Sequence, residues 1–585
     1  MEVVYIYMKD YLGLKEKEYN FHENYKFYFD KKLKEISMKE TEIKIPEIFF
    51  GEKINSINAI IGENGKGKTR ILDFIYKYSN NYRNFIKFKK ENLFEINKNI
   101  NKSCEADFII ILKGKENELY INSNLLEKGK KQNLVGVKTF YYSNIFDYDH
   151  VFKQRDRKFG RKKYDLSITE EFLRISPKKY NINSIFINIK IQNDIKQINL
   201  IKDLKVKYNE FYEILKQELY LPENIVLDFL WFENTKMNTK FQVELNKEYM
   251  KIYDGFESES ISSLAKELFK RFFIINMWGI ITGEEINLEK EKDFKNENLH
   301  ILEKLDAILN FANIKKSKDK LYFLLDINYA NDLLEIIKEI ENKIQNKSKF
   351  KFKFKIDLRK IPLEMRRVID YSWENAMSSG EKGLLRLFSY LHEVLHTDEE
   401  LENLVLLIDE LDATFHPEWQ RKALDLLVKY LNNYSKYIKS NLTSQLIISS
   451  HSPFLIADLP KEKIIALDNI GNQKENKELT AFGANILDIY KENFFLTSTF
   501  GEFAKGKITN VIELLSKGEN EYIKLSEDKK NEIKIIINSV GEPLIKNKLK
   551  KMYLDLKKEN QIQEIKRIMK EKGIDLEDLR EEGIQ

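Results

Sequence analysis

The sequence has 585 residues, of which 42% are hydrophobic and 12% aromatic, so it can build large cores and is too long for one ordinary domain. Its 98 basic and 93 acidic residues give a net charge of only +5. The charge of the whole chain therefore does not indicate nucleic-acid binding, which would need a local basic patch. A single cysteine, Cys104, cannot form an internal disulfide, as expected in a reducing cytoplasm. The longest apolar run, residues 272–281, is far shorter than the roughly 20 residues of a membrane span. We therefore expect a cytoplasmic protein that is not inserted in a membrane.

The first part of the chain is rich in predicted strands. Runs of β-branched and aromatic residues predict strands at 3–8 and 25–30. Residues 57–78 predict a buried strand, a glycine-rich turn and an amphipathic helix in succession. Further strands are predicted at 107–114, 118–123 and 137–145. We expect these segments to form a first domain over residues 1–148.

The rest of the chain is predicted to alternate between helical and mixed regions. Residues 149–348 carry apolar side chains at three- to four-residue spacing, which predicts a mainly helical domain. Residues 349–500 should form another α/β domain, with strands at 349–358, 401–410 and 444–453. The charged residues 501–585 predict a helical tail.

The segment Gly62-Glu63-Asn64-Gly65-Lys66-Gly67-Lys68-Thr69 matches G-x-x-x-x-G-K-[ST] between a predicted strand and a predicted helix. Its glycines let backbone N–H groups point at phosphate oxygens, and the helix N-terminus favours an anion. Lys68 would contact the β- and γ-phosphates of ATP, and Thr69 would bind Mg²⁺. The structural alternative is a glycine turn that happens to precede a lysine. The residues expected to bind nucleotide here are Gly62, Asn64, Gly65, Gly67, Lys68 and Thr69.

Two acids, Asp409 and Glu410, end the apolar strand at 401–410. With a phosphate-binding loop upstream, Asp409 is expected to hold Mg²⁺ and Glu410 to activate the attacking water as general base. Without that loop, two acids after a strand would most often be the start of a loop.

Three further motifs gain meaning from their order in the chain. The segment "MSSGEK" (377–382) resembles the signature of ABC ATPases, although as a bare string it is also an ordinary helix cap by Ser378. Together with "LLIDELDATFHPEWQ" and "LIISSHSPFLIADLP", it resembles ABC-type ATPases of the RecF, SMC and OLD class. The later segment "FGANILDIYKENFFLTSTFGEFAKGKI" is similar to ATPases of Septu-type and retron-associated anti-phage systems. The resemblance covers the first 80 residues and roughly 355–515.

The resemblance implies roles for several residues. Ser378 and Gly380 would reach the γ-phosphate held by an opposite subunit, Asp412 would be an inter-subunit loop residue, and His451 would be the switch histidine. A clear Q-loop glutamine is missing, and Asn144 is the substitute. The implied fold is α/β: an ABC-type P-loop ATPase head split into two lobes, with a large helical insertion and a helical C-terminal tail.

Residues 392–396 read His-Glu-Val-Leu-His, which matches the H-E-x-x-H motif of zinc proteases. The motif lies on the predicted signature helix, whose apolar stripe needs burial. The candidate third ligands downstream, Glu410 and His416, already have places in the ATPase interpretation. We therefore expect neither a peptidase nor bound zinc.

The expected function is that of an ATPase using ATP and Mg²⁺, assembled as a homodimer or higher oligomer with composite sites, that gates a partner effector in anti-phage defence. The resemblance implies a nuclease as that partner, such as a small HNH protein. The basic run at 153–163 is either a solvated loop or a contact for the phosphate backbone of a nucleic acid. Two alternatives remain open: a DNA-repair ATPase of the RecF or SMC type, and a nuclease of the OLD type.

Overall fold

The computed structural model describes the chain in two compact units, residues 1–494 and 495–585, which are treated separately below. The structure describes all residues except 42–43, 81–83, 90–95, 98–99, 102–105, 115–117, 127–130, 133, 135, 144–163, 168–181, 230–239, 257–260, 283–287, 318–319, 348–369, 376, 435–437, 440, 476–478, 495, 497 and 572–585. The strand expected at 349–358 therefore lies outside the described residues.

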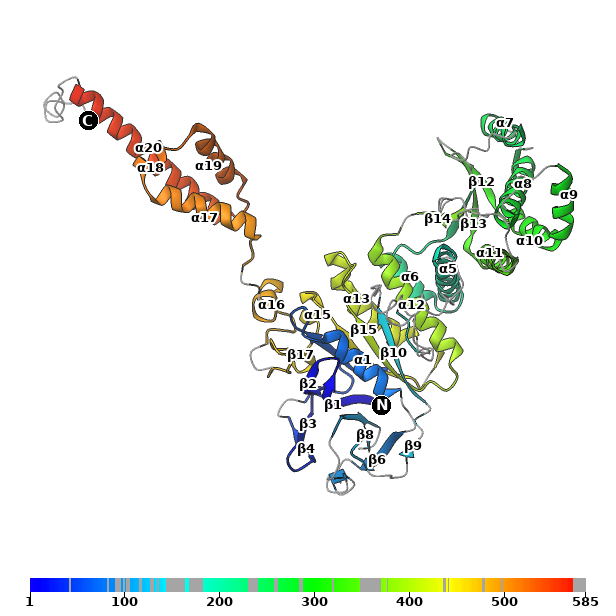
Figure 1. The fold of residues 1–585 in the computed structure, drawn as a ribbon, viewed down its shortest axis with the longest axis horizontal. Helices are drawn as coiled ribbons and strands as arrows, with labels where there is room; N and C mark the ends of the chain where they lie inside the picture. Colours follow the sequence, from blue (N-terminus) through cyan, green and yellow to red (C-terminus); the bar gives the residue numbers. More distant parts are fainter. Residues whose placement is uncertain are drawn as a thin grey trace. The chain divides into compact units, whose positions relative to one another are not determined.

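A five-stranded parallel sheet forms the centre of the first unit (Figure 1). Its order is β10 (Val137–Ser143), β15 (Asn403–Asp409), β16 (Thr443–Ser449), β5 (Ile54–Ile61) and β17 (Ile464–Ala466). Every residue of β15 is buried. Such continuous burial is typical of parallel strands, because helices cover both faces of the sheet. The strands predicted around residues 57, 401 and 444 are confirmed.

Two helices cover opposite faces of this sheet. The alternate β15 residues Val405 and Leu407 join the apolar cluster of Ile71 and Ile75 on α1 (Lys68–Ser79). The intervening residues Leu404, Leu406 and Ile408 belong to the cluster that contains α12 (Ser379–Thr397). The stripe predicted on that helix is buried, and it consists of Leu384, Leu387, Phe388, Leu391, Val394 and Leu395.

An antiparallel sheet packs on the outer side of α1. Its order is β2 (Leu14–Asn20), β1 (Glu2–Tyr11), β7 (Phe108–Lys113), β8 (Glu118–Ser123), β6 (Phe85–Lys89) and β9 (Lys131–Gln132). A separate hairpin joins β3 (Tyr25–Asp30) to β4 (Glu35–Glu40). Val3 and Ile6 on β1 and Ile110 on β7 of the six-stranded sheet share an apolar core with α1. The strands predicted in the first part of the chain are thus present, and they hold the helix that follows the glycine-rich turn.

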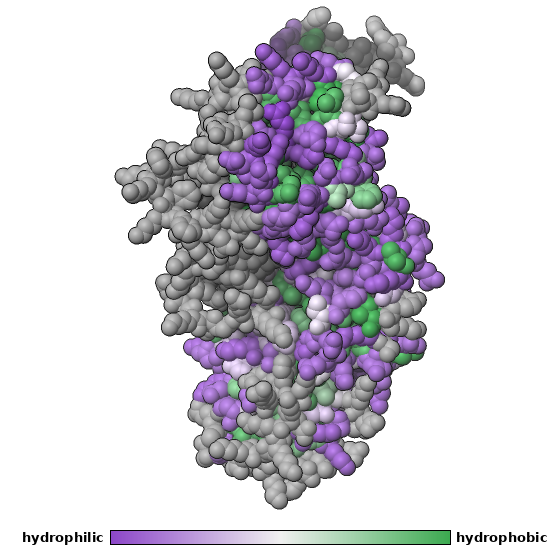
Figure 2. Space-filling model, turned by 90° about the vertical axis from the view of Figure 1, so that its right-hand side faces the viewer, coloured by the Kyte–Doolittle hydropathy of each residue, from purple (hydrophilic) through white to green (hydrophobic). Residues whose placement is uncertain are grey.

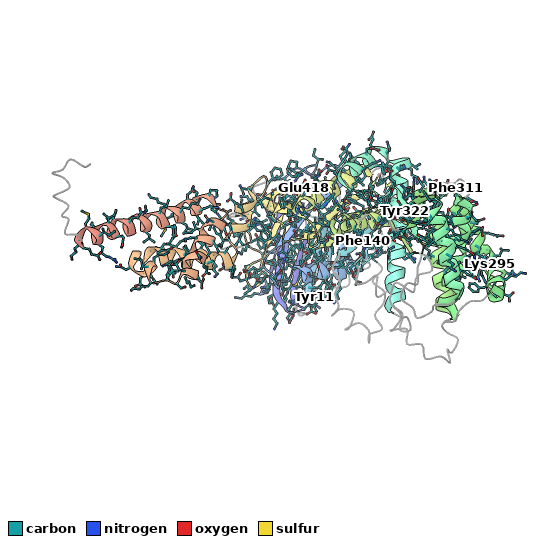
Figure 3. The ribbon with its side chains drawn as sticks, turned by 90° about the horizontal axis from the view of Figure 1, so that it is seen from above. Tyr11, Phe140, Lys295, Phe311, Tyr322 and Glu418 are labelled. Atoms are coloured by element: carbon teal, nitrogen blue, oxygen red, sulfur yellow. The ribbon has the colours of Figure 1, made fainter. Side chains whose placement is uncertain are left out.

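The region expected to be mainly helical contains helices and an unexpected sheet. The helices are α5 (Ile182–Lys207), α6 (Asn209–Glu218), α7 (Lys240–Asp254), α8 (Ile261–Thr282), α9 (Leu288–Glu297), α10 (Leu299–Asn310) and α11 (Ile327–Lys347). The sheet has the order β12 (Asn313–Lys316), β13 (Leu321–Asp326), β11 (Asn224–Asp228) and β14 (Asp370–Trp373). Its last strand lies after residue 348, in the part of the chain that was expected to form the next domain. Lys295, Phe311 and Tyr322, labelled in Figure 3, lie on or directly after α9, α10 and β13.

The first unit ends in short helical segments, which are α13 (Pro417–Lys429), a π-helical turn (Tyr430–Tyr434), α15 (Pro453–Ala457), a 3₁₀ turn (Lys461–Lys463) and α16 (Ile486–Glu492). The face drawn in Figure 2 is mainly hydrophilic where it is coloured, with small separate apolar patches.

The second unit is helical, as predicted for the tail. It comprises α17 (Glu502–Ser516), α18 (Glu519–Ile523), α19 (Glu527–Ser539) and α20 (Pro543–Glu571). Val511, Ile533, Ile537 and Leu549 lie in its own apolar core. No helix in the described part of either unit is both long and apolar enough to cross a membrane.

Candidate nucleotide-binding site

A glycine-rich loop joins β5 to α1 at the carboxyl end of the parallel sheet. Gly65 and Gly67 have φ angles of +80° and +100°, a backbone region that side chains other than glycine rarely adopt. A Cβ atom on Gly67 would lie 2.7 Å from Cδ2 of Leu14. The loop therefore needs glycine at residue 67 for both its conformation and its space, and it leads directly into the N-terminus of α1.

Lys68 is the first residue of α1, and its side chain folds back over the loop. Its Nζ donates to the carbonyl oxygens of Gly62 at 2.9 Å and Glu63 at 3.3 Å. Burial lowers the pKa of Lys68, whereas the carboxylates of Glu410, Asp409 and Asp412 oppose that shift. The ammonium of Lys68 is buried and is held by uncharged carbonyl oxygens. It is therefore placed to bind a charged oxygen ligand such as a phosphate, which forms a stronger hydrogen bond.

Three hydroxyl groups hold the buried carboxylate of Asp409 at the end of β15. Thr69 donates to Oδ1 across 3.2 Å, Tyr141 donates to Oδ2 across 2.9 Å, and Ser449 donates to Oδ1 as well. Burial and the charge of Asp409 raise the pKa of Tyr141, so this phenol stays a hydrogen-bond donor. Thr69 and Asp409, which were predicted to share a magnesium ion, are thus in direct contact, and both offer the oxygen ligands that Mg²⁺ prefers.

Sequence reasoning missed Tyr141 and Ser449. Both lie on strands next to β15, and the parallel register pairs Ser449 with Asp409 and Tyr141 with Leu407. The order of the strands would have identified them. Polar residues at the ends of the strands on either side of β15 are expected to contact Asp409. That order could not be read from one sequence.

Glu410 follows directly after β15 with a φ angle of +49°, which is uncommon for a residue other than glycine. Its backbone N–H is held by the carbonyl oxygen of Ser449 at 3.1 Å and by the hydroxyl of the same serine at 3.0 Å. Burial and the neighbouring charge of Asp409 raise the pKa of Glu410, while Lys68 opposes that shift. A half-buried carboxylate with a raised pKa is suited to accept a proton from water.

Asp412 and His451 lie beside these acids. The backbone N–H of His451 donates to Oδ2 of Asp412 at 3.2 Å. Burial lowers the pKa of His451, and the charge of Lys68 adds to that effect. Oδ1 of Asp412 and Nε2 of His451 are buried, and neither has a hydrogen-bond partner among the described residues. Because a buried polar atom without a partner is costly, these two atoms mark a place that fits a polar ligand.

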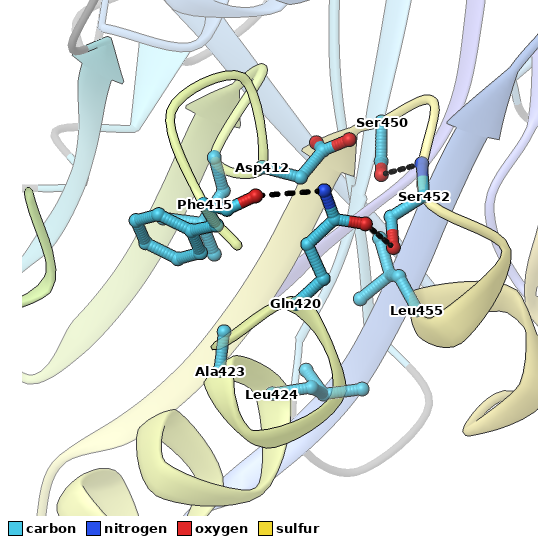
Figure 4. A pocket seen from close by; sticks show the side chains of 9 residues that line it. Asp412, Phe415, Gln420, Ala423, Leu424, Ser450, Ser452 and Leu455 are labelled. Atoms are coloured by element: carbon cyan, nitrogen blue, oxygen red, sulfur yellow. Dashed lines mark hydrogen bonds between the residues drawn. The ribbon is translucent and has the colours of Figure 1, made fainter. Parts of the chain in front are cut away.

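A small pocket continues from Asp412 toward α13 (Figure 4). Gln420 spans it by donating to the carbonyl oxygen of Phe415 at 3.1 Å and accepting from the hydroxyl of Ser452 at 2.9 Å. This bridge fixes the loop after Glu410 against the loop after His451. Gln420 is a further residue that sequence reasoning did not identify.

The signature-like segment forms the start of α12. Ser378 caps the helix: its hydroxyl accepts from the backbone N–H of Glu381 at 3.2 Å, and the carboxylate of Glu381 accepts from the Ser378 N–H at 2.8 Å. A Cβ atom on Gly380 would come within 3.3 Å of Trp419. Within one chain, Ser378 therefore acts as a helix cap and remains exposed.

The structure thus brings together Lys68, Thr69, Asp409, Glu410, Asp412 and His451. Asn144, the substitute for a Q-loop glutamine, and the basic run at 153–163 lie outside the described residues. The loop, the ammonium, the carboxylates and the two buried atoms without partners fit a magnesium-bound nucleotide. Gly62, Gly65, Gly67 and Asn64 would surround its phosphates, and Thr69 and Asp409 would hold the metal.

The H-E-x-x-H motif has a third polar neighbour that the sequence analysis did not foresee. Asp203 on α5 lies 3.0 Å from Nε2 of His392 and 3.3 Å from Nε2 of His396. Glu393, which would be the general base of a zinc protease, pairs instead with Lys196 at 3.2 Å. The third ligands considered from the sequence, Glu410 and His416, follow the motif, whereas Asp203 precedes it in the chain. The pairing of Glu393 still argues against a peptidase.

Residues 283–457 match the family model described as "AAA domain, putative AbiEii toxin, Type IV TA system". This range includes the signature-like segment, the acids after β15 and His451, while the glycine-rich loop lies before it. No curated protein matches the chain. Over residues 283–457 the chain is similar to that AAA domain family, which supports a P-loop ATPase of the AAA/ABC type.

Proposed function

We propose that the chain binds ATP with Mg²⁺ and hydrolyses it to ADP and phosphate. The observation that carries this proposal is the meeting of Thr69 and Asp409 beside the glycine-rich loop, with Glu410 next along the chain. The family match over residues 283–457 supports the same activity. Bound Mg²⁺ would neutralise charge that develops on the phosphates during the reaction.

Each residue has a separate task in this proposal. Lys68 binds and orients the phosphates, and the backbone of the loop supplies further donors. Thr69 and Asp409 position the metal, with Tyr141 holding Asp409 in place. Glu410 accepts a proton from the attacking water. His451, kept neutral by its lowered pKa, can donate a hydrogen bond from Nε2 to a phosphate oxygen.

We further propose that two copies combine to complete each site. The support is that Ser378 is exposed at the start of a helix of 19 residues, whose N-terminus favours an anion, while Gly380 is buried beside Trp419. Together with the resemblance to ABC ATPases, this favours a role for Ser378 and Gly380 at the nucleotide of a second copy. ATP would then hold the dimer together.

The proposed biological role is to gate a partner effector in anti-phage defence, with a nuclease as that effector. The resemblance to Septu-type and retron-associated ATPases supports it. The acids of the described site, Asp409 and Glu410, are already used for phosphoryl transfer from ATP. The second unit also exposes apolar side chains that a partner could cover, among them Phe503 at 83% and Leu544 at 79% exposure.

The test compares two lysines of the same loop. Lys68→Ala should abolish ATP binding and phosphate release by the purified chain. Lys66→Ala is the matched control, because its Nζ contacts the carbonyl oxygen of Asn469 at 2.8 Å and lies at the exposed side of the loop. Equal hydrolysis by wild type and Lys68→Ala would refute the proposed site.

A second assay tests the need for a partner. The pure protein should hydrolyse ATP without degrading DNA or RNA, and toxicity should require a companion protein. Cleavage of nucleic acid by the isolated chain with Mg²⁺ or Mn²⁺, persisting in Lys68→Ala, would replace this proposal with the nuclease alternative.

A further inference from the structure

The end of the signature helix carries a cluster that the nucleotide site does not use. His392 and His396 lie one turn apart on α12, with their rings 4.2 Å apart, and Asp203 approaches them from α5. One nitrogen or oxygen from each of the three side chains lies within 4.8 Å of the others. Two imidazoles and one carboxylate are a ligand set found in zinc sites.

The hydrogen bond made by Nδ1 of His396 leaves its Nε2 facing a carboxylate oxygen of Asp203. Nδ1 of His396 contacts the backbone carbonyl of His392 at 2.9 Å. A carbonyl only accepts, so Nδ1 carries the hydrogen and Nε2 of the neutral ring presents a lone pair. That lone pair faces the carboxylate oxygen of Asp203 at 3.3 Å. Two lone pairs repel each other at this distance unless a positive charge, either a proton or a metal ion, lies between them.

We propose that Asp203, His392 and His396 bind a divalent cation of the zinc class. Tetrahedral ligands bonded to zinc at about 2.0 Å are roughly 3.3 Å apart. The separations of Asp203 Oδ2 from the two Nε2 atoms, 3.0 and 3.3 Å, agree with that spacing. His396 keeps about a third of its side chain exposed, which leaves room for water as a further ligand.

The surroundings of the three ligands are those of a prepared site. The other carboxylate oxygen of Asp203 binds Lys207 at 2.9 Å, which orients the carboxylate so that Oδ2 faces the two histidines. Oδ2 lies within hydrogen-bond distance of Nε2 of His392, at 3.0 Å, and a bound cation would take the place of the hydrogen between these two atoms. The Nδ1 contact of His396 fixes its ring in the same way.

Such a metal would tie the helical insertion to the signature helix. Asp203 lies near the end of α5, and both histidines lie in the last two turns of α12. The two helices also meet through Tyr390, which donates to Asn193 at 2.9 Å. A cation shared by both helices would fix the position of α5 relative to the helix that begins at Ser378. Since Glu393 is paired with Lys196, the site would be structural and would not cleave peptides.

Zinc binding to the metal-stripped full chain tests the proposal. Equilibrium dialysis with ⁶⁵Zn²⁺ is done in excess Mg²⁺, so that Asp409 and Glu410 do not contribute. Wild type should bind one Zn²⁺ per chain and melt at a higher temperature with Zn²⁺ than without. Co²⁺ in place of Zn²⁺ should give the visible absorption of a tetrahedral site.

His396→Gln and Asp203→Asn should lose this binding and the thermal shift, and both replace side chains that are at least partly exposed. His300→Gln is the matched control, because His300 forms a surface pair with Glu339 at 2.7 Å without a second histidine. It should bind Zn²⁺ as wild type does. No Zn²⁺ on wild type, or unchanged stoichiometry in both His396→Gln and Asp203→Asn, would overturn the proposal and leave a proton as the cation.

Discussion

The hydroxyl of Thr69 lies 3.2 Å from the carboxylate of Asp409, although 340 positions separate the two residues in the chain. The parallel sheet makes this contact, because β5 and β15 both border β16 and end at the same edge. A threonine after a phosphate-binding loop and an aspartate after a buried strand are the two protein ligands that a nucleotide-bound Mg²⁺ needs. The contact therefore defines the centre of the proposed site.

Tyr141→Phe should raise the Mg²⁺ concentration that hydrolysis needs while the protein stays folded. The substitution removes the hydrogen bond from the phenol to the buried carboxylate of Asp409, which should cost about 1.5–3 kcal/mol of stability. We expect the Mg²⁺ concentration for half-maximal hydrolysis to rise about tenfold, because Asp409 loses an orienting partner. Hydrolysis measured across a Mg²⁺ titration checks this.

Tyr142→Phe is the control for that experiment. The neighbouring phenol donates to the carbonyl oxygen of Gly383 at 3.0 Å, on the other face of the sheet. It should cost about 0.5–1.5 kcal/mol of stability, because the acceptor is uncharged, and leave the Mg²⁺ dependence unchanged. A rise of equal size in both variants would show that Tyr141 acts only through the fold.

The rate of hydrolysis should fall at acidic pH because of Glu410. Burial raises the pKa of its carboxyl above the ordinary value of 4.5, and only the deprotonated form accepts a proton from water. The rate should therefore decline as the pH falls through this raised pKa, at a higher pH than an exposed glutamate would give. The residual rate of Glu410→Gln should lack this decline, and a decline that persists in that variant would assign it to another group.

The same raised pKa predicts an effect on stability. The folded state binds the Glu410 proton more tightly than the unfolded state, so stability falls as the pH rises from the ordinary pKa to the raised one. At neutral pH the cost of the buried charge is fully present. Glu410→Gln should therefore raise the melting temperature at pH 7, and the gain should shrink below pH 4. A lower melting temperature at pH 7 would contradict it.

Mixtures of inactive variants test composite sites. Lys68→Ala disables the loop of its own chain, and Ser378→Arg blocks the signature-like segment that would serve the other chain. A mixed dimer keeps one intact site, so combining the two should restore hydrolysis. A mixture of Lys68→Ala and Glu410→Gln is the control and should not restore hydrolysis. Each of these changes inactivates the site built on the glycine-rich loop of its own chain, so a mixed dimer has no intact site. No rescue in either mixture would count against composite sites.

The parts of the site that could be predicted depend on local pattern. The spacing Gly62 to Thr69 and the apolar run before Asp409 are short motifs whose strand and helix context can be read directly. Asp412 and His451 required the resemblance to ABC ATPases. The structure brings both to the same place as Lys68.

The parts that could not be predicted depend on contacts between distant segments. Tyr141 and Ser449 flank Asp409 only because of the order β10-β15-β16, which periodicity does not specify. The sheet that includes β12 and β14 was missed because both strands have only four residues, and because β14 pairs with β11, which lies far earlier in the chain. Asp203 precedes His392 by 189 positions, and no local sequence pattern links the two residues.

Retention of ATP by Glu410→Gln tests the proposed hydrolysis most directly. The variant keeps Lys68, Thr69 and Asp409, so it should bind radiolabelled ATP with wild-type affinity. Its single-turnover rate should be about 10²–10⁴-fold lower, because only water activation is lost. ATP should therefore be recovered uncleaved from the purified complex, whereas wild type yields ADP. Turnover by Glu410→Gln at the wild-type rate would contradict the assignment of Glu410 as the general base.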